Sequence, residues 1–155
     1  MRSVVGGQTT EIRVQRSEGG GERVLGMAER IESFRDLVVY QKAFSLQQII
    51  FETTKSFPKE ELFSLTDQIR RASRSIGSNI AEAWHKRLYI AHFVSKLTDS
   101  DGEQAETQHW IHTAYHCKYI SPEKRDDLVE RCMEVGRILG SMISYPEKFC
   151  RHQIK

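Results

Sequence analysis

The chain has 155 residues, of which 39% are hydrophobic, so it is long enough to bury the core of one domain and too short for two to be expected. Its formal net charge of +2 neither requires nor excludes a nucleic-acid partner. No run of about 18 apolar residues occurs, and the N-terminus lacks the charged-then-apolar order of a secretory signal. These features predict a cytoplasmic protein that does not insert into a membrane.

The first part of the chain has the composition of a disordered segment. Residues 1–26 contain six of the ten glycines and few large apolar side chains, which cannot offset the entropy cost of ordering. The segment Glu11–Arg16 alternates like a strand, but an isolated strand is unstable. We therefore expect a disordered extension over residues 1–33, and we hypothesise that Met27 is the natural start because periodic sequence follows it directly.

Helical periodicity begins near Leu37 and continues to Lys55. Its apolar side chains cover an arc wider than one neighbouring helix needs, so two of its faces are expected to be buried. The dipeptide Phe57-Pro58 ends this helix, and the acidic stretch 59–61 suits the N-terminus of the next one. Because the connection is short, the first two helices should form an antiparallel hairpin.

The second helix is predicted around the stretch QIRRASRSIGSNIAEAW, residues 68–84. Gly77-Ser78 in its middle is a pairing found at helix kinks, and an interior glycine costs roughly 1 kcal/mol relative to alanine, so Gly77 should have a packing reason. Asn79 lies at the edge of the apolar stripe and is predicted to be buried, tying the disturbed backbone to a neighbouring helix. No nucleophile or base stands beside Asn79, which favours a structural role for it. The apolar stripe consists of Leu62, Leu65, Ile69, Ala72, Ile76, Ile80 and Ala83.

Two further helices complete the predicted fold. The third runs from about Leu88 to Tyr119, and an acidic band at residues 99–106, facing solvent or a partner, interrupts its apolar side. The fourth begins at Ser121-Pro122 with an N-cap and a proline at its first position, and ends before Tyr145-Pro146. Four helices with short links predict an all-α, antiparallel up-down-up-down four-helix bundle over residues 34–146, followed by a C-terminal tail over residues 147–155.

Three stretches of the chain resemble one protein family. FRDLVVYQKA, TTKSFPKEELFSLTDQIRRASRSIGSNIAEAW and EVGRILGSMI, in this order, resemble the four-helix-bundle proteins encoded by intervening sequences within some bacterial 23S rRNA genes. That family is similar to the accessory variability determinant of diversity-generating retroelements. The resemblance implies a closed ring, with a homopentamer as the expected assembly, no enzymatic activity, and RNA or a reverse transcriptase as partners.

The sequence differs from the family pattern at the end of the second helix. Gly77 stands where the family usually has proline, and Ala83 where it usually has glycine. Residues 84–87, Trp-His-Lys-Arg, replace a Gly-Arg-x-Ser turn. The junction between the second and third helices is therefore the part of the fold that the resemblance describes least well.

The sequence gives no sign of a catalytic or metal site. His109, His112 and His116 lie on one side of the third helix, but no E-x-x-H pair completes a ligand set. The three cysteines are widely spaced, as expected of reduced thiols. Phosphate loops, G-x-S-x-G elbows and C-x-x-C motifs are also absent from the sequence. We expect no enzyme, no cofactor, no metal and no small-molecule substrate.

A basic cluster at the second helix is the candidate nucleic-acid site. The cluster has five cations and two carboxylates, Asp67 and Glu82. The cations form either a solvated helix face, in which Asp67 pairs with Arg71, or a patch that contacts phosphates and is repeated around a ring. Trp84 and Trp110 could stack on bases but are predicted to anchor a subunit interface. The five cations are Arg70, Arg71, Arg74, Lys86 and Arg87.

These features together predict a non-catalytic, oligomeric helical bundle that acts as a binding or scaffold protein for RNA or a nucleic-acid enzyme such as a reverse transcriptase. An adaptor that binds only proteins is the alternative. A metal-dependent bundle enzyme is the third possibility, which metal analysis of the purified protein would test.

Overall fold

The computed structural model describes residues 4–5, 8–9 and 30–150, in two units, Met1–Glu32 and Ser33–Lys155. In the first unit, β1 (Val4–Val5) pairs antiparallel with β2 (Gln8–Thr9), with Val4 opposite Thr9. These four residues therefore differ from the disordered extension expected there. The segment Glu11–Arg16 and the proposed start at Met27 lie outside the described residues.

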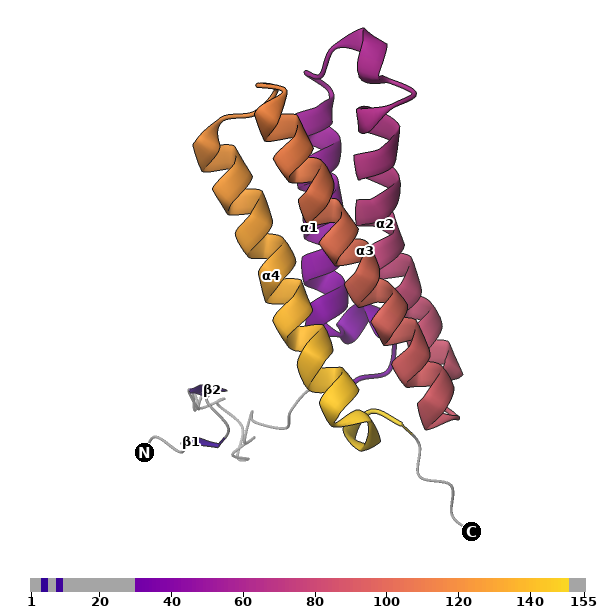
Figure 1. Ribbon diagram of the computed structural model, residues 1–155. Helices are drawn as coiled ribbons and strands as arrows, with labels where there is room; N and C mark the ends of the chain where they lie inside the picture. Colours follow the sequence, from indigo (N-terminus) through magenta and orange to yellow (C-terminus); the bar gives the residue numbers. More distant parts are fainter. Residues whose placement is uncertain (1–3, 6–7, 10–29, 151–155) are drawn as a thin grey trace, which may run out of the picture. The chain divides into compact units, whose positions relative to one another are not determined.

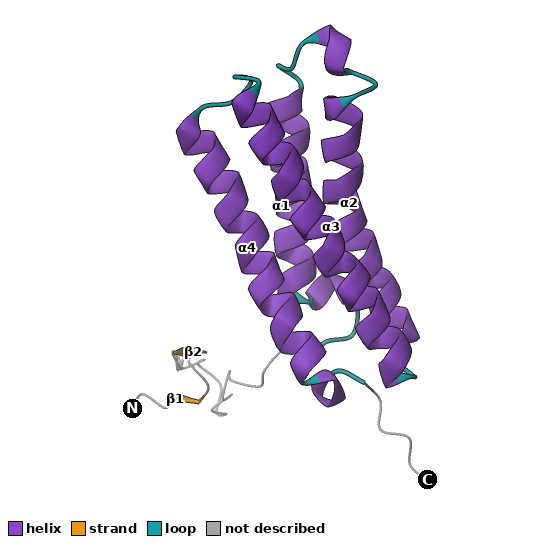
Figure 2. Ribbon diagram, viewed as in Figure 1, coloured by secondary structure: helices purple, strands orange, loops and turns teal. Residues whose placement is uncertain are grey.

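The second unit is a bundle of four long helices. They are α1 (Val38–Thr54), α2 (Leu65–Lys86), α3 (Ile90–His116) and α4 (Pro122–Ser144). A short connection joins each helix to the next, and the two helices that it joins pack against each other (Figures 1 and 2). Helix α4 also packs against α1. The predicted all-α, antiparallel up-down-up-down bundle is confirmed, whereas the closed ring stays a prediction. Along the described part of the chain, no helix combines the length and apolar character needed to cross a membrane.

Short 3-10 turns and side-chain caps set the helix ends. The turn η1 (Phe34–Asp36) is held by a capping box at Ser33, and the N-cap predicted for α4 is present, because Ser121 Oγ accepts from the Lys124 N–H at 3.1 Å. The acidic stretch 59–61 forms the separate turn η2 (Lys59–Glu61), so α2 begins later than predicted. Glu61 nevertheless caps α2 from outside, since its Oε2 accepts from the Leu65 N–H at 3.1 Å.

Small hydroxyl side chains occupy core positions in the middle of α3. Ser100 and Thr107 are fully buried where the apolar pattern fails, while the apolar residues Ala105 and Ile90 are exposed. Ser100 Oγ donates to the Ile76 carbonyl of α2 at 2.9 Å, and Thr107 Oγ1 donates to the Glu103 carbonyl at 2.8 Å. Because both hydroxyls are satisfied, these positions can be buried without being apolar.

The predicted C-terminal tail belongs in part to the folded unit. After the turn η3 (Pro146–Lys148), the Phe149 ring stacks on Phe93 with centroids 6.0 Å apart, and Cys150 is buried. These contacts cover the end of the bundle core, so the folded unit extends at least to residue 150 and not only to residue 146. Cys150 is a free thiol, as are the buried Cys132 and the exposed Cys117. Burial raises the pKa of Cys132 to about 12.

The structure contradicts the packing reason expected for Gly77. Helix α2 continues without interruption through Gly77, and a Cβ at this position would lie 3.6 Å from Tyr40 Cε2, an ordinary van der Waals separation. A methyl group would therefore fit against α1. The sequence reasoning failed here because it inferred a close approach from the cost of glycine in a helix.

The substitution Gly77→Ala should stabilise the bundle. We expect the free energy of unfolding to rise by about 0.5–1 kcal/mol in urea denaturation, the difference in helix propensity between the two residues. Gly136→Ala is the matched control, because a Cβ there would lie 2.9 Å from Gln104 Nε2 and force that side chain to move. The free energy of unfolding should rise less in Gly136→Ala than in Gly77→Ala. A loss of stability in Gly77→Ala would show that α2 needs glycine at this turn.

A hydrogen bond between the two connections at one end of the bundle should make stability depend on pH. Glu61 accepts from the Leu65 N–H and from Tyr119 Oη, 2.9 Å away, and these bonds hold the pKa of Glu61 below its ordinary value of 4.5. A lowered pKa in the folded state contributes stability above the unfolded-state pKa, which is lost as the pH falls through the folded-state value.

Tyr119→Phe removes one of these two bonds, so the variant should be less stable than the wild type at pH 7. The difference should shrink as the pH falls from about 4.5, the unfolded-state value, through the lower pKa that Glu61 has in the folded state. Urea midpoints at neutral and acidic pH measure this. Tyr145→Phe, on an exposed tyrosine beyond α4, is the control and should show no such trend. An equal difference at every pH would contradict the role of Glu61.

Candidate nucleic-acid interface

Two of the five predicted basic residues, both on α2, cluster around the Phe51 ring of α1. Arg70 and Arg74 are four residues apart on α2, so they share one face. Their guanidinium carbons lie 4.8 and 5.6 Å from the centroid of the Phe51 ring, and Lys55 Nζ lies 4.8 Å from the same centroid. We call Phe51, Lys55, Arg70 and Arg74 the Phe51 cluster.

The Phe51 cluster has an excess of positive charge. Lys55 pairs with Glu52 at 2.8 Å, whereas within residues 30–150 neither Arg70 nor Arg74 forms an ion pair with a carboxylate. Arg70 Nε donates to Thr54 Oγ1 at 2.8 Å, which fixes the direction of its side chain. The cluster therefore presents two held guanidinium groups with no neutralising partner among these residues.

The other three predicted cations lie elsewhere and have other contacts. Arg71 is 3.9 Å from Asp67, the pair expected of a solvated face, and Lys86 pairs with Glu82 at 2.8 Å. The Arg87 guanidinium covers the Trp84 ring at 3.7 Å and donates to the Trp84 carbonyl. The structure thus brings together Arg70 and Arg74 but does not join Arg71, Lys86 or Arg87 to them.

The two tryptophans differ from each other in burial. Trp84 is 6% exposed and belongs to the core of its own bundle, so it does not fit the predicted place at a subunit interface. Trp84 lies four residues after Ile80, on the same side of α2, and the Arg87 guanidinium covers its ring. Trp110 is half-buried, and its Nε1 donates to Glu106 Oε1 at 3.1 Å. Its interface role stays a prediction.

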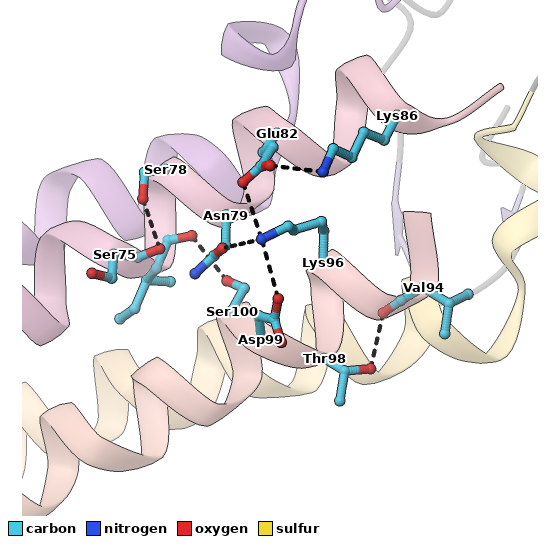
Figure 3. A network of polar contacts seen from close by, with 11 residues as sticks. Ser75, Ser78, Asn79, Glu82, Lys86, Val94, Lys96, Thr98, Asp99 and Ser100 are labelled. Atoms are coloured by element: carbon cyan, nitrogen blue, oxygen red, sulfur yellow. Dashed lines mark hydrogen bonds and ion pairs between the residues drawn. The ribbon is translucent and has the colours of Figure 1, made fainter. Parts of the chain in front are cut away.

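A lysine connects α2 and α3 on a second polar surface. Lys96 Nζ lies 3.1 Å from Glu82 Oε2, 3.2 Å from Asp99 Oδ2 and 3.4 Å from Asn79 Oδ1 (Figure 3). The pKa of Lys96 is raised mainly by its hydrogen bond to Glu82 and, second, by its hydrogen bond to Asp99. The pKa of Glu82 is lowered by hydrogen bonds from Lys86 and Lys96. The network holds the ammonium group between the two helices.

Asn79 does not have the environment predicted for it. Its side chain is half-buried and accepts from a lysine, whereas we expected a buried amide bonded to disturbed backbone (Figure 3). The reason is that α2 is regular at this point, so the backbone has no unpaired groups for Asn79 to satisfy. The cross-helix bond to a backbone carbonyl is made instead by Ser100.

The three histidines of α3 lie on its exposed side. His109, His112 and His116 are all exposed, and the His109 ring meets the Trp110 ring edge to face, with centroids 4.6 Å apart. In the part of the chain that the structure describes, no group of three His, Cys, Asp or Glu side chains could hold a metal ion. Burial, with Glu106 and Asp99 nearby, raises the pKa of Glu103 in the acidic band.

Comparison with known proteins identifies the family. Residues 35–141, more than half of the chain, match the model of the family described as 23S rRNA-intervening sequence protein. The chain belongs to the 23S rRNA-intervening sequence protein family. A solved structure from Bacteroides thetaiotaomicron, described as a protein of unknown function from the S23 ribosomal protein family, is 30% identical, with a TM-score of 0.63 over 69% of this chain and 96% of that one. No curated protein matches the chain.

The region that matches the family model contains the whole Phe51 cluster. Sequence reasoning found Arg70 and Arg74 but missed Phe51 and Lys55, which come from a different helix. The signal that could have found Phe51 is its place outside the main apolar stripe of α1, formed by Val39, Ala43, Leu46 and Ile50. A large aromatic residue off the core stripe is available to a neighbouring helix or to solvent.

The Lys96 network of this family member gives a stability test. Asn79→Leu should change the free energy of unfolding by less than about 1 kcal/mol, because it removes a single long contact at a half-buried site. Lys96→Met should lower the urea midpoint more, since it leaves Asp99 without its cation, and added salt should reduce that difference. A larger loss for Asn79→Leu than for Lys96→Met would restore the buried role first expected of Asn79.

Proposed function

We propose that this protein is a non-catalytic binding or scaffold protein that contacts the phosphates of RNA through Arg70 and Arg74. The observation that supports this most directly is the pair of guanidinium groups held on the Phe51 ring without a carboxylate partner among the described residues. The family description refers to a sequence within 23S rRNA, which fits an RNA-related role. It names no catalytic activity.

The chemistry of the cluster suits phosphate. Arginine presents a planar fork of donors that matches phosphate oxygens, and stacking on an aromatic ring restricts its motion. Arg70 uses Nε to donate to Thr54, so its terminal nitrogens remain to meet a phosphate. Since the side chain is already positioned, less conformational entropy is lost when an anion binds.

The proposal includes assembly of several copies in the cytoplasm. A homopentamer follows from the family resemblance, and copies of the Phe51 cluster around a ring would add their counterion release. Apolar side chains on the surface of the single chain support self-association, because isolated monomers rarely expose contiguous apolar patches. They include Leu88, Tyr89 and Ile90 at the α2–α3 turn. A reverse transcriptase remains the proposed partner enzyme, with no membrane and no small-molecule substrate.

A protein-binding adaptor is the second candidate. It is favoured by Phe63, which is 93% exposed at the turn between α1 and α2, next to the exposed Leu62. A projecting aromatic side chain of this kind is typical of an anchor that fills a pocket on a protein partner. In that case the guanidinium pair would meet carboxylates of the partner.

The RNA proposal predicts binding that weakens steeply with salt. Fluorescence anisotropy with a labelled structured RNA should show binding at ~50 mM salt, with a log-log salt slope of about 0.7 to 0.9 for each phosphate contacted. The double substitution Arg70→Glu and Arg74→Glu should lower the affinity for RNA. It should also make the salt slope less steep, by the equivalent of about two phosphate contacts for each bound subunit.

The control has the same charge change on another helix. Arg131→Glu and Arg137→Glu reverse two cations on α4 that pair with Asp127 and Glu130, and this double variant should keep most of the affinity. Light scattering of each sample measures whether assembly changed. If the wild type fails to bind RNA at ~50 mM salt, where electrostatic contacts are strongest, the proposal is wrong and the adaptor function takes its place.

A further inference from the structure

A second stripe of α1, separate from its core stripe, leads from the Phe51 cluster along the seam with α2. Tyr40, Phe44, Gln47 and Phe51 are spaced at i, i+4, i+7 and i+11, so they lie on one side of the helix. This side faces α2, because a Cβ at Gly77 would lie 3.6 Å from Tyr40 and 3.8 Å from Gln47 Oε1.

The Phe44 ring is held at the surface by its neighbours. Phe44 is 46% exposed, and its ring stacks on that of Tyr40 with centroids 6.1 Å apart and an interplanar angle of 27°. Phe34 packs edge to face on Tyr40 at 4.9 Å. Three aromatic rings thus pack in a row, with Phe44 stacked on Tyr40 at the end of the row and partly exposed to solvent.

The spacing relates this stack to the two unpaired arginines. Phe44 precedes Phe51 by seven residues, which is two turns of helix, or ~10.5 Å along α1. A group contacting Phe44 can therefore belong to the same ligand as an anion held by Arg70 and Arg74. A single exposed phenylalanine is ordinary on a protein surface. Single-strand-binding proteins combine cations that follow the backbone with aromatic rings that stack on bases. Phe44 and the two guanidinium groups supply both kinds of group on one side of α1.

We propose that the RNA bound at the Phe51 cluster is single-stranded and that one of its unstacked bases packs on Phe44. This inference rests on the proposed function, and it adds the form of RNA that is recognised. A duplex offers phosphates to Arg70 and Arg74 but keeps its base faces inside the stack, so it leaves Phe44 in water. Stacking on a phenylalanine does not distinguish strongly between bases, so the sequence preference is weak. Gln47, between the two sites, has an amide that can meet a base edge.

The test compares three RNAs by fluorescence anisotropy with the full chain. They are an unstructured 12-nucleotide strand, the same strand paired with its complement, and the same strand with abasic positions throughout its middle. At ~50 mM salt, where phosphate contacts are strongest, the wild type should bind the single strand more tightly than the other two. Phe44→Ala should weaken single-strand binding by about five-fold or more, the range measured for loss of one stacked base, with no change for the duplex.

Further variants separate stacking from folding. Phe44→Leu keeps an apolar side chain without a ring and should lose affinity as Phe44→Ala does, whereas Phe44→Trp should retain it. Tyr145→Ala is the control, because it removes another exposed aromatic ring at the end of α4. Circular dichroism and urea midpoints show whether each variant is folded, and should Phe44→Ala unfold, the Leu and Trp variants decide the result.

Each outcome has one meaning. Equal affinity for single strand, duplex and abasic strand, or no effect of Phe44→Leu, overturns the inference but leaves phosphate binding in place. A change in molecular mass on Phe44→Leu, measured by light scattering, also overturns it, since the ring then belongs to a contact between copies of the chain. If no RNA binds the wild type, the proposed function fails, and the inference fails with it.

Discussion

The packing of α2 against α3 is the contact on which the rest of the bundle depends. The apolar face of α2 is buried along its whole length, from Leu65 to Trp84, and α3 covers much of it. Ser100 donates across this contact to a backbone carbonyl of α2, and Lys96 closes its solvent side between Glu82 and Asp99. The serine bond is buried and needs close approach of the two helices, so it fixes their separation.

With one face of α2 held by α3, the side that meets α1 is also fixed. The seam between α1 and α2 contains an unusual mixture for a bundle, with aromatic rings on α1 and arginines on α2. Arg70 and Arg74 cover the Phe51 ring, and Gly77 lies opposite Tyr40. The two arginine contacts bury part of the Phe51 ring under guanidinium groups, which stabilises the seam by cation–π attraction while keeping the charges near water.

Under the proposed function, this combination supplies the binding surface of the bundle. The guanidinium groups gain their positions from contacts made on folding, so they are ordered before any ligand arrives. The remaining basic residues of α2 are neutralised by Asp67 and Glu82 or stacked on Trp84. Positive charge is therefore concentrated at one end of the α1–α2 seam, although the net charge of the chain is only +2.

The sequence by itself determined the number, order and direction of the helices. The apolar period of α2, the cap at Ser121 and the proline that follows α1 are local features, so they could be interpreted without knowing the neighbours of each helix. The family resemblance rested on the same stretches, and the match over residues 35–141 confirms it. What local patterns could not show was the partner of each polar side chain.

Only the tertiary structure decided those partners. The Asp67–Arg71 pair is an exception, because it is local to α2 and could be expected from the sequence. That Arg70 and Arg74 meet Phe51 could not, because it depends on which side of α2 faces α1. Trp84 was predicted to anchor a subunit interface because it is a large aromatic residue, but it lies in the core of its own bundle, where Arg87 covers its ring. Ser100 and Thr107 are buried because neighbouring carbonyls satisfy them, which no pattern of hydrophobicity records.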